Sequence, residues 1–162
     1  MEEGRQMIHD VTPTLDGGYI AVGYSEFLNF ELGTKESPNI YFLKLDEKGN
    51  KEWDRIYSFT DKYKSSLEFS LLSSVQELDD GNYIAAGVYF SGVKKGNVII
   101  IKFDRFGNII WERTYGGKDN DGLCFVQPTN DGGYIAVGWT WSFGKGGSDM
   151  YILKLDENGN LQ

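Results

Sequence analysis

The chain has little that would support cysteine chemistry, a membrane anchor or nucleic-acid binding. Its single cysteine, Cys124, excludes an intrachain disulfide and a cysteine metal cluster. Its longest strongly apolar run, residues 98–101, is far shorter than the roughly 20 residues of a membrane-spanning helix. Residues 1–5 lack the basic and then apolar pattern of a signal peptide. Acidic residues outnumber basic ones 24 to 16, and the net charge of −8 disfavours nucleic acids and anionic membranes as partners.

Glycine and aromatic residues, by contrast, are abundant. The 162 residues suit a single domain, residues 1–162, and the 40% of hydrophobic residues are enough for a core of ordinary density. The 21 glycines beside 15% aromatic residues indicate many tight turns between short strands rather than disorder. Helices are not expected, because no long apolar pattern has the helical period.

Two sequence blocks occur three times in the chain, and a third block occurs twice. The first block reads Asp-Gly-Gly-Tyr-Ile-Ala-Val-Gly, with two changes in its second copy; its copies are residues 16–23, 80–87 and 131–138. The second block has the pattern Lys-x-Asp-x-x-Gly-Asn; its copies are residues 44–50, 102–108 and 154–160. The third block, Trp-x-Arg-x-Tyr, has no third copy; its copies are residues 53–57 and 111–115. These repeats predict three similar structural units.

Each repeat is expected to form four short strands joined by tight turns. Strand-forming residues dominate four runs of the second repeat, and Asp, Asn and Gly bound them. These runs are residues 71–77, 83–90, 98–104 and 109–115. Consecutive strands joined by such short turns are antiparallel neighbours. A four-stranded antiparallel sheet repeated at about fifty residues is typical of a β-propeller blade, so the expected fold class is all-β.

The middle strands of the second repeat are expected to be covered on both faces. The three isoleucines at residues 99–101 run without the polar alternation that a sheet with one wet face would need. The small residues Ala85, Ala86 and Gly87 are expected to let a neighbouring sheet approach closely. The pattern therefore predicts blades packed face to face.

The blocks resemble a widespread bacterial and archaeal β-propeller repeat, with DGGYI-x-x-G followed by KLD-x-x-GN-x-x-W-x-x-x-Y-GG. The resemblance covers nearly the whole chain and implies a propeller fold with blades like those of WD40 and kelch proteins, but no catalytic residues. The spacing Asp46-x-x-Gly49-x-x-x-Trp53 is similar to the Asp-box of sialidases and to the tryptophan motif of quinoprotein propellers. In both families, the resemblance implies, this motif holds a turn and locks blades together. Proteins that resemble this repeat are often exported, so the location of this chain stays open.

The repeats give three blades, at about residues 6–59, 71–117 and 123–162, and the last blade lacks its outer strand. Closed propellers have about four to eight blades, so three would leave two apolar blade faces exposed. Two interpretations remain open: the chain is part of a longer propeller, or two copies form a homodimer that closes a six-bladed ring. Residues 1–5 of a partner are a candidate for covering the open edge of the last blade, although they lack the Trp-x-x-x-Tyr pattern.

Residues with catalytic potential are few. His9 is the only histidine, Cys124 lies in an apolar run, and neither has a partner that suggests nucleophilic catalysis. Four arginines do not suggest the arginine cluster of a sialidase site, and an incomplete ring does not suit a quinone cofactor. Residues 119–122 and 156–160 are rich in Asp and Asn but lack the spacing of a calcium loop, and we expect them to be turns. We expect no catalytic residue, metal or cofactor.

The best candidates for ligand binding are aromatic residues at the end of the second strand of each repeat. They are Tyr24 and Phe27, Tyr89, and Trp139, Trp141 and Phe143. Aromatic side chains on a loop rim can anchor a peptide or stack on a glycan, and the alternative is packing between blades. The sequence favours a non-catalytic scaffold for binding or assembly. The alternative function is a carbohydrate-acting hydrolase with its site in the central channel of a completed ring.

Overall fold

The computed structural model describes residues 4–29, 34–35, 39–57, 69–90 and 96–162. This part of the chain consists of strands and turns and contains no helix, which confirms the all-β fold class. Accordingly, none of the described segments is a helix long and apolar enough to cross a membrane.

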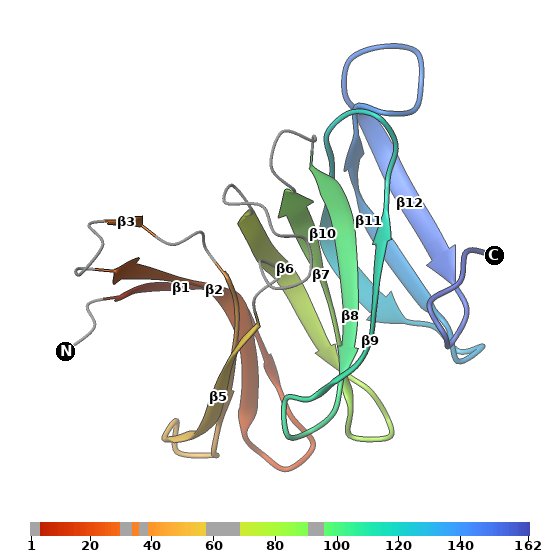
Figure 1. Ribbon diagram of the computed structural model, residues 1–162. Helices are drawn as coiled ribbons and strands as arrows, with labels where there is room; N and C mark the ends of the chain where they lie inside the picture. Colours follow the sequence, from red (N-terminus) through yellow and green to blue (C-terminus); the bar gives the residue numbers. More distant parts are fainter. Residues whose placement is uncertain (1–3, 30–33, 36–38, 58–68, 91–95) are drawn as a thin grey trace.

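Three antiparallel sheets follow one another along the chain, each with its strands side by side in chain order (Figure 1). The first sheet consists of β1 (Gly4–Pro13), β2 (Tyr19–Asn29), β4 (Asn39–Leu45) and β5 (Lys51–Tyr57), and the short β3 (Thr34–Lys35) pairs with the end of β2. The second sheet consists of β6 (Phe69–Glu77), β7 (Tyr83–Phe90), β8 (Asn97–Phe103) and β9 (Ile109–Tyr115). The third sheet consists of β10 (Asp121–Pro128), β11 (Tyr134–Thr140) and β12 (Asp149–Leu155). The four strands predicted for the second repeat are therefore confirmed, with small differences at β6 and β8.

The sheets are stacked face to face, with the second sheet in the middle (Figure 1). The first strands of the sheets lie next to one another, since β6 contacts both β1 and β10. We call the face of a sheet that looks toward the next sheet in the chain its forward face, and the opposite face its backward face. The stack has the arrangement of propeller blades and is not closed into a ring.

The second sheet is covered on both faces, as predicted. Ile99 and Ile101 belong to an apolar cluster shared with the first sheet, whereas Val98 and Ile100 belong to a cluster shared with the third sheet. All four side chains are completely buried. Neighbouring residues of a strand point to opposite faces, so an unbroken apolar run is the pattern that a sheet between two others requires.

The small residues of β7 play two different roles. Ala85 faces the first sheet and Ala86 faces the third, as the prediction of a close approach requires. Gly87 has a further role, because the atoms nearest to it belong to its own sheet. A side chain at Gly87 would place Cβ 2.0 Å from the carbonyl oxygen of Leu71 in β6. The pairing of β6 with β7 shifts register at this point, and the bulge pushes the β6 backbone toward the glycine.

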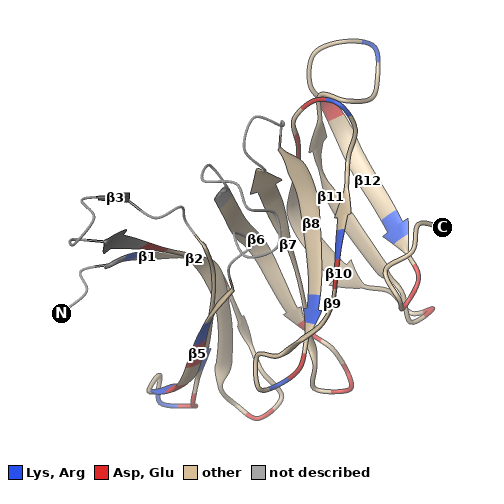
Figure 2. Cartoon of the chain, in the orientation of Figure 1, with Lys and Arg blue, Asp and Glu red and all other residues tan. Residues whose placement is uncertain are grey.

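The Lys-x-Asp-x-x-Gly-Asn block forms the same turn in all three sheets. In the first copy the Asp46 carboxylate accepts hydrogen bonds from the backbone N–H groups of Lys48 and Asn50 and from the Asn50 side-chain amide, at 2.8 to 2.9 Å. These bonds, that of the Asn50 amide first, lower the pKa of Asp46. Gly49 takes the left-handed conformation that closes the turn, with φ of +81°. Acidic residues lie at several of the turns between strands (Figure 2).

Asp104 and Asp156 make the equivalent bonds in the second and third sheets. The expectation that residues 156–160 form a turn is therefore confirmed. The expectation for residues 119–122 is wrong in its second half, because Asp121 and Gly122 begin β10.

Candidate binding surfaces

The first two repeat blocks meet in space, a contact that was not predicted from the sequence. The Asp that begins the first block forms an ion pair with the Lys that begins the second block of the same repeat. The pairs are Lys44–Asp16 at 2.9 Å, Lys102–Asp80 at 3.7 Å and Lys154–Asp131 at 2.7 Å. The signal that could have revealed them is the recurrence of both residues together in every repeat. These ion pairs therefore connect the turn between the first two strands of each sheet with the third strand of the same sheet.

The first of these pairs is set apart by burial. The side chain of Lys44 is only 3% exposed, and a second carboxylate, that of Glu52, lies 3.3 Å from its Nζ. Asp16 accepts hydrogen bonds from the Thr14 hydroxyl, from Lys44 and from the Gly18 N–H, which together lower its pKa to about 2. Lys154, in contrast, remains 32% exposed.

The third block joins each sheet to the next one. The Trp53 and Arg55 side chains lie over the β8–β9 turn of the second sheet. A Cβ built on Gly107 in this turn would be 3.0 Å from the Trp53 ring and 2.8 Å from Arg55 Cγ. Trp111 and Arg113 cover Gly159 of the third sheet in the same way. We call each such pair a Trp–Arg clamp. The role implied by the Asp-box and quinoprotein resemblances, a motif that locks blades together, matches this geometry.

The β4–β5 turn of the first sheet, which contains Gly49, has the same shape as the β8–β9 turn but is not covered by a Trp–Arg clamp in the described structure. Gly49 has a φ of +81°, close to the +85° of Gly107, yet nothing in the described part of the chain lies within 4 Å of a Cβ built on it. The surroundings of the two glycines therefore differ by the presence of the Trp–Arg clamp.

This difference supports a prediction about stability. Both Gly49→Ala and Gly107→Ala place an alanine in the left-handed conformation, which costs about 1–2 kcal/mol. We expect Gly107→Ala to cost about 1 kcal/mol more, because its methyl group also displaces Trp53 and Arg55. Urea unfolding of both variants measures the difference, and equal losses in the free energy of unfolding would show that the clamp does not hold the turn.

The aromatic candidates of the first two repeats lie mainly in packed positions. Tyr89 is buried in the cluster between the first and second sheets, and Tyr24 is half-buried with its ring 5.6 Å from that of His9. Phe27 pairs with Gly4 through its backbone, but its side chain lies outside the described part of the structure. The positions of Tyr24 and Tyr89 favour packing, the alternative interpretation of these residues.

The aromatic candidates of the third repeat do not come together on one face. Trp139 pairs with Met150 across the strands, so its side chain lies on the forward face of the third sheet. Phe143 is half exposed and contacts Tyr151, which points to the backward face. Trp141 is 55% exposed and follows the end of β11. These three residues form no common platform, and a ligand-binding role for them stays a prediction.

Asp121 anchors the loop that carries these aromatic residues. Its buried carboxylate accepts hydrogen bonds from the Thr140 and Ser142 hydroxyl groups and from the Gly117 N–H. Burial raises the pKa of Asp121, but these donors outweigh that effect and the net direction is downward. The carboxylate therefore has hydrogen-bond partners within the protein, and these bonds connect the loop after β9 with the third sheet.

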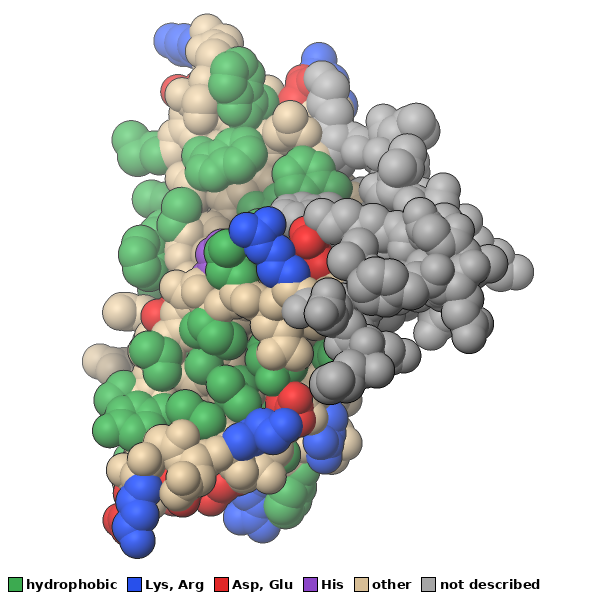
Figure 3. Space-filling model, turned by 90° about the vertical axis from the view of Figure 1, so that its left-hand side faces the viewer, with side chains coloured by type: hydrophobic (Ala, Val, Ile, Leu, Met, Phe, Trp, Pro, Cys, Tyr) green, Lys and Arg blue, Asp and Glu red, His purple; other side chains and the backbone are tan. Residues whose placement is uncertain are grey.

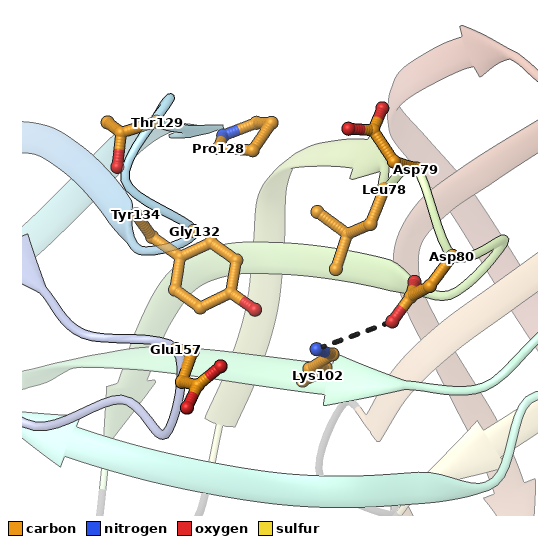
Figure 4. A pocket seen from close by; sticks show the side chains of 9 residues that line it. All are labelled: Leu78, Asp79, Asp80, Lys102, Pro128, Thr129, Gly132, Tyr134 and Glu157. Atoms are coloured by element: carbon orange, nitrogen blue, oxygen red, sulfur yellow. Dashed lines mark ion pairs between the residues drawn. The ribbon is translucent and has the colours of Figure 1, made fainter.

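A small pocket lies between the turns of the second and third sheets (Figure 4). Its volume is about 270 Å³, slightly below the range typical of ligand pockets. Lys102 points into it from β8, within ion-pair distance of Asp80, and Glu157 lies on the opposite wall. The lining contains neither histidine nor cysteine. Among the described residues, no group of three or more His, Cys, Asp or Glu is arranged to hold a metal ion.

The forward face of the third sheet is an exposed apolar surface whose counterpart on the second sheet is buried. Phe125, Val137 and Ile152 form one row across its three strands, and Met150 lies beside them. Ile152 is 58% exposed, whereas the equivalent Ile100 of the second sheet is completely buried against the third sheet. Positions that form a sheet-to-sheet contact in one repeat are therefore uncovered in the next.

The backward face of the first sheet is also apolar. Ile8, Val11, Tyr19 and Ile56 are exposed there. Figure 3 looks toward this end of the molecule and shows hydrophobic side chains over much of its described surface. The stack thus ends in two apolar faces, and they correspond to the two halves of a sheet-to-sheet contact.

Comparison with known proteins adds no family to this description. No protein-family model matches the chain, and no curated protein matches it.

Proposed function

We propose that this protein is a non-catalytic β-propeller scaffold that functions by assembling with a partner through its terminal sheet faces. The proposal is carried by one observation, the exposure on the third sheet of positions that are buried on the second. Contiguous exposed apolar surface of this kind marks an interaction site. The resemblance of the repeats to a β-propeller family supports the same conclusion, because it implies a propeller fold but no set of catalytic residues.

The polar residues that the repeats share support a scaffold rather than an enzyme. The carboxylates of Asp46, Asp104 and Asp156 accept turn hydrogen bonds, and those of Asp16 and Asp131 bind lysines and turn N–H groups. The Trp and Arg residues of the third block form the clamps. Each of these groups therefore already has a structural partner within the protein.

The partner that best fits the two faces is a second copy of the chain. The backward face of the first sheet, with Val11 and Tyr19, is the kind of surface that the third sheet would meet in a further blade. Two chains joined head to tail through these faces would contribute six sheets, which lies within the range of about four to eight blades in closed propellers. A two-fold axis then makes the two junctions equivalent.

The molar mass in dilute solution tests this proposal. We expect light scattering to give twice the 18.3 kDa of one chain. Ile152→Lys places a charge in the proposed junction and is expected to give the mass of one chain, because burying an unpaired charge is costly. Phe106→Lys is the matched control, since Phe106 is equally exposed, at 56%, but lies in a turn of the second sheet.

A change in molar mass is informative only if the variant is folded, so the fold of each variant is checked as well. Circular dichroism that matches the wild type shows that each variant is folded, so that a change in mass reports the junction. A wild-type mass of one chain at every concentration, or equal effects of the two substitutions, would contradict the proposal.

A further inference from the structure

The two contacts between neighbouring sheets differ where the first turn of one sheet meets the next sheet. In the first contact, between the first and second sheets, the Glu77 carboxylate at the end of β6 accepts a hydrogen bond of 2.5 Å from the backbone N–H of Leu15. In the second contact, between the second and third sheets, the equivalent residues are Pro128 at the end of β10 and Asp79. Proline has no side-chain acceptor. Within the described structure, the backbone N–H of Asp79 therefore has no hydrogen-bond partner.

The lysines of the two contacts differ in the same direction. Carboxylate oxygens lie 2.9 and 3.3 Å from the Nζ of Lys44, which is only 3% exposed. The equivalent Lys102 is 16% exposed and has one ion pair, with Asp80 at 3.7 Å, which is too long for a hydrogen bond. Ile110 stands where the first sheet has Glu52, the second carboxylate at Lys44. Among the described residues, the largely buried ammonium group of Lys102 therefore has no hydrogen-bond acceptor.

These donors lie around the pocket between the turns of the second and third sheets. The Lys102 ammonium and the Tyr134 hydroxyl point into the space between the turns (Figure 4). Tyr134 is buried, its hydroxyl makes no hydrogen bond within the described structure, and its ring centre lies 5.9 Å from Lys102 Nζ. Asp79 also lines the pocket, and Leu78 and Pro128 give it an apolar wall. Three hydrogen-bond donors and an apolar wall thus surround one space of about 270 Å³.

We propose that this pocket binds the carboxylate group of a small acid or of an acidic side chain, in the position that Glu77 occupies in the first contact. The Asp79 N–H, the Lys102 ammonium and the Tyr134 hydroxyl donate hydrogen bonds to the carboxylate, and hydrogen bonds between charged groups are the strong ones. The carbon chain of the ligand lies against the apolar wall. The site lies between two sheets of a single chain, so it does not depend on the proposed assembly.

The acidic residues around the pocket are compatible with an anionic ligand. The Asp80 carboxylate already accepts hydrogen bonds from the backbone N–H and the side-chain amide of Asn82. The Asp79 carboxylate points away from Lys102 (Figure 4), and both Asp79 and Glu157 are exposed, so water and salt screen their charges. In the first contact, Glu77 keeps its hydrogen bond although two other carboxylates flank the lysine there.

Two small ions of opposite charge test the site. Butyrate and the n-butylammonium ion have the same carbon chain, and each is added to the ¹⁵N-labelled protein at neutral pH and constant ionic strength. We expect NMR shift changes that saturate with butyrate, with a dissociation constant of about 1–10 mM, as suits so small a ligand. The Asp79 amide signal is expected to move most, because its N–H gains a carboxylate partner. The n-butylammonium ion is expected to leave this signal unchanged.

Variants of the pocket show whether butyrate binds there. Pro128→Glu supplies a carboxylate from the protein itself, as Glu77 does in the first contact, and is expected to weaken butyrate binding at least about tenfold. Asn130→Asp is the matched control, because it adds the same charge in the neighbouring turn without lining the pocket. It is expected to bind butyrate like the wild type. Lys102→Met keeps the length of the side chain but removes the ammonium group, and a loss of at least about tenfold is expected there too.

A capped peptide distinguishes the two sources of the carboxylate. The peptide is acetyl-Gly-Glu-Gly-amide, in which the glutamate side chain carries the only carboxylate. If the ligand is an acidic side chain of a polypeptide, the peptide shifts the Asp79 amide at least as strongly as butyrate does at the same concentration. If the ligand is a small free acid, only butyrate does so.

The outcomes also separate this inference from the proposed function. The inference is overturned if butyrate gives no saturable shifts, if n-butylammonium gives the same shifts, or if Pro128→Glu binds butyrate like the wild type. Ile152→Lys, the variant of the proposed junction, lies outside the pocket and is expected to keep butyrate binding. A protein with the mass of one chain that binds butyrate supports the pocket and contradicts the assembly. A protein with twice that mass and no butyrate binding does the reverse.

Discussion

Replacing Gly87 with alanine is expected to reduce the free energy of unfolding by about 3 kcal/mol. The new Cβ would lie 2.0 Å from the carbonyl oxygen of Leu71, and the obstacle is backbone rather than the end of a flexible side chain. Relief requires the β6–β7 bulge to move within the sheet that packs against both others. Urea unfolding followed by circular dichroism measures the loss.

Gly81→Ala is the control for this substitution. Gly81 lies in the turn that precedes β7 and has a φ of +75°, and a methyl group added there would meet no described atom within 4 Å. The substitution therefore costs only backbone strain, about 1–2 kcal/mol. A Gly87→Ala protein as stable as Gly81→Ala would show that the bulge yields easily and that our account of this glycine is wrong.

Asp16→Asn is expected to destabilise the protein by about 2 kcal/mol at neutral pH. The substitution removes the nearer of the two carboxylates that compensate the buried Lys44 ammonium and leaves only Glu52, at 3.3 Å. Breaking a buried ion pair from one side costs about 3–5 kcal/mol when the remaining charge has no other partner. The second carboxylate and the exposure of the Asp16 side chain, 56%, both reduce that cost.

Asp131→Asn is the matched control, because Asp131 also accepts hydrogen bonds from a threonine hydroxyl and a glycine N–H. Its lysine, Lys154, is 32% exposed and can turn to water when the carboxylate is lost. We expect a smaller loss of stability there. Equal losses would show that the turn hydrogen bonds, and not the burial of Lys44, account for the effect.

The pH dependence gives a second measure of the same contact. The pKa of Asp16 is lowered from 3.8 to about 2 in the folded protein, by the Thr14 hydrogen bond first and then by Lys44. A lowered pKa stabilises the folded state above the unfolded value, and this contribution disappears as the pH falls from about 4 to about 2. The stability of Asp16→Asn is therefore expected to fall less over this interval than that of the wild type.

Features that depend on neighbouring residues in the chain could be predicted well. The strands of the second sheet and the turn at residues 156–160 follow from local preferences: a run of isoleucines favours a strand, and the Asp, Gly and Asn residues form the turn with one another. The isoleucines at residues 99–101 also revealed burial on both sides, because side-chain alternation is itself a local property of a strand.

Features that depend on contacts between distant residues could not be predicted in the same way. The sequence suggested one role for the aromatic residues of the third repeat, but Trp139 and Phe143 lie on opposite sides of the sheet. Asp121, expected in a turn, is the buried acceptor for Thr140 and Ser142. Such contacts depend on which strands pair and in which register.

For this protein, then, the amino-acid sequence alone was enough to establish the all-β repeat, its strands and its turns, since each of these arises within a few consecutive residues. Only the folded chain decided that Gly87 lies at a bulge within its own sheet, that Lys44 is buried while Lys154 is not, and that Gly49 lacks the clamp found on Gly107. The bulge recurs in all three sheets, because it depends on how the first two strands of each sheet pair. The other two differences arise because similar blocks acquire different surroundings from their place in the stack, and a terminal sheet has a neighbour on one side only.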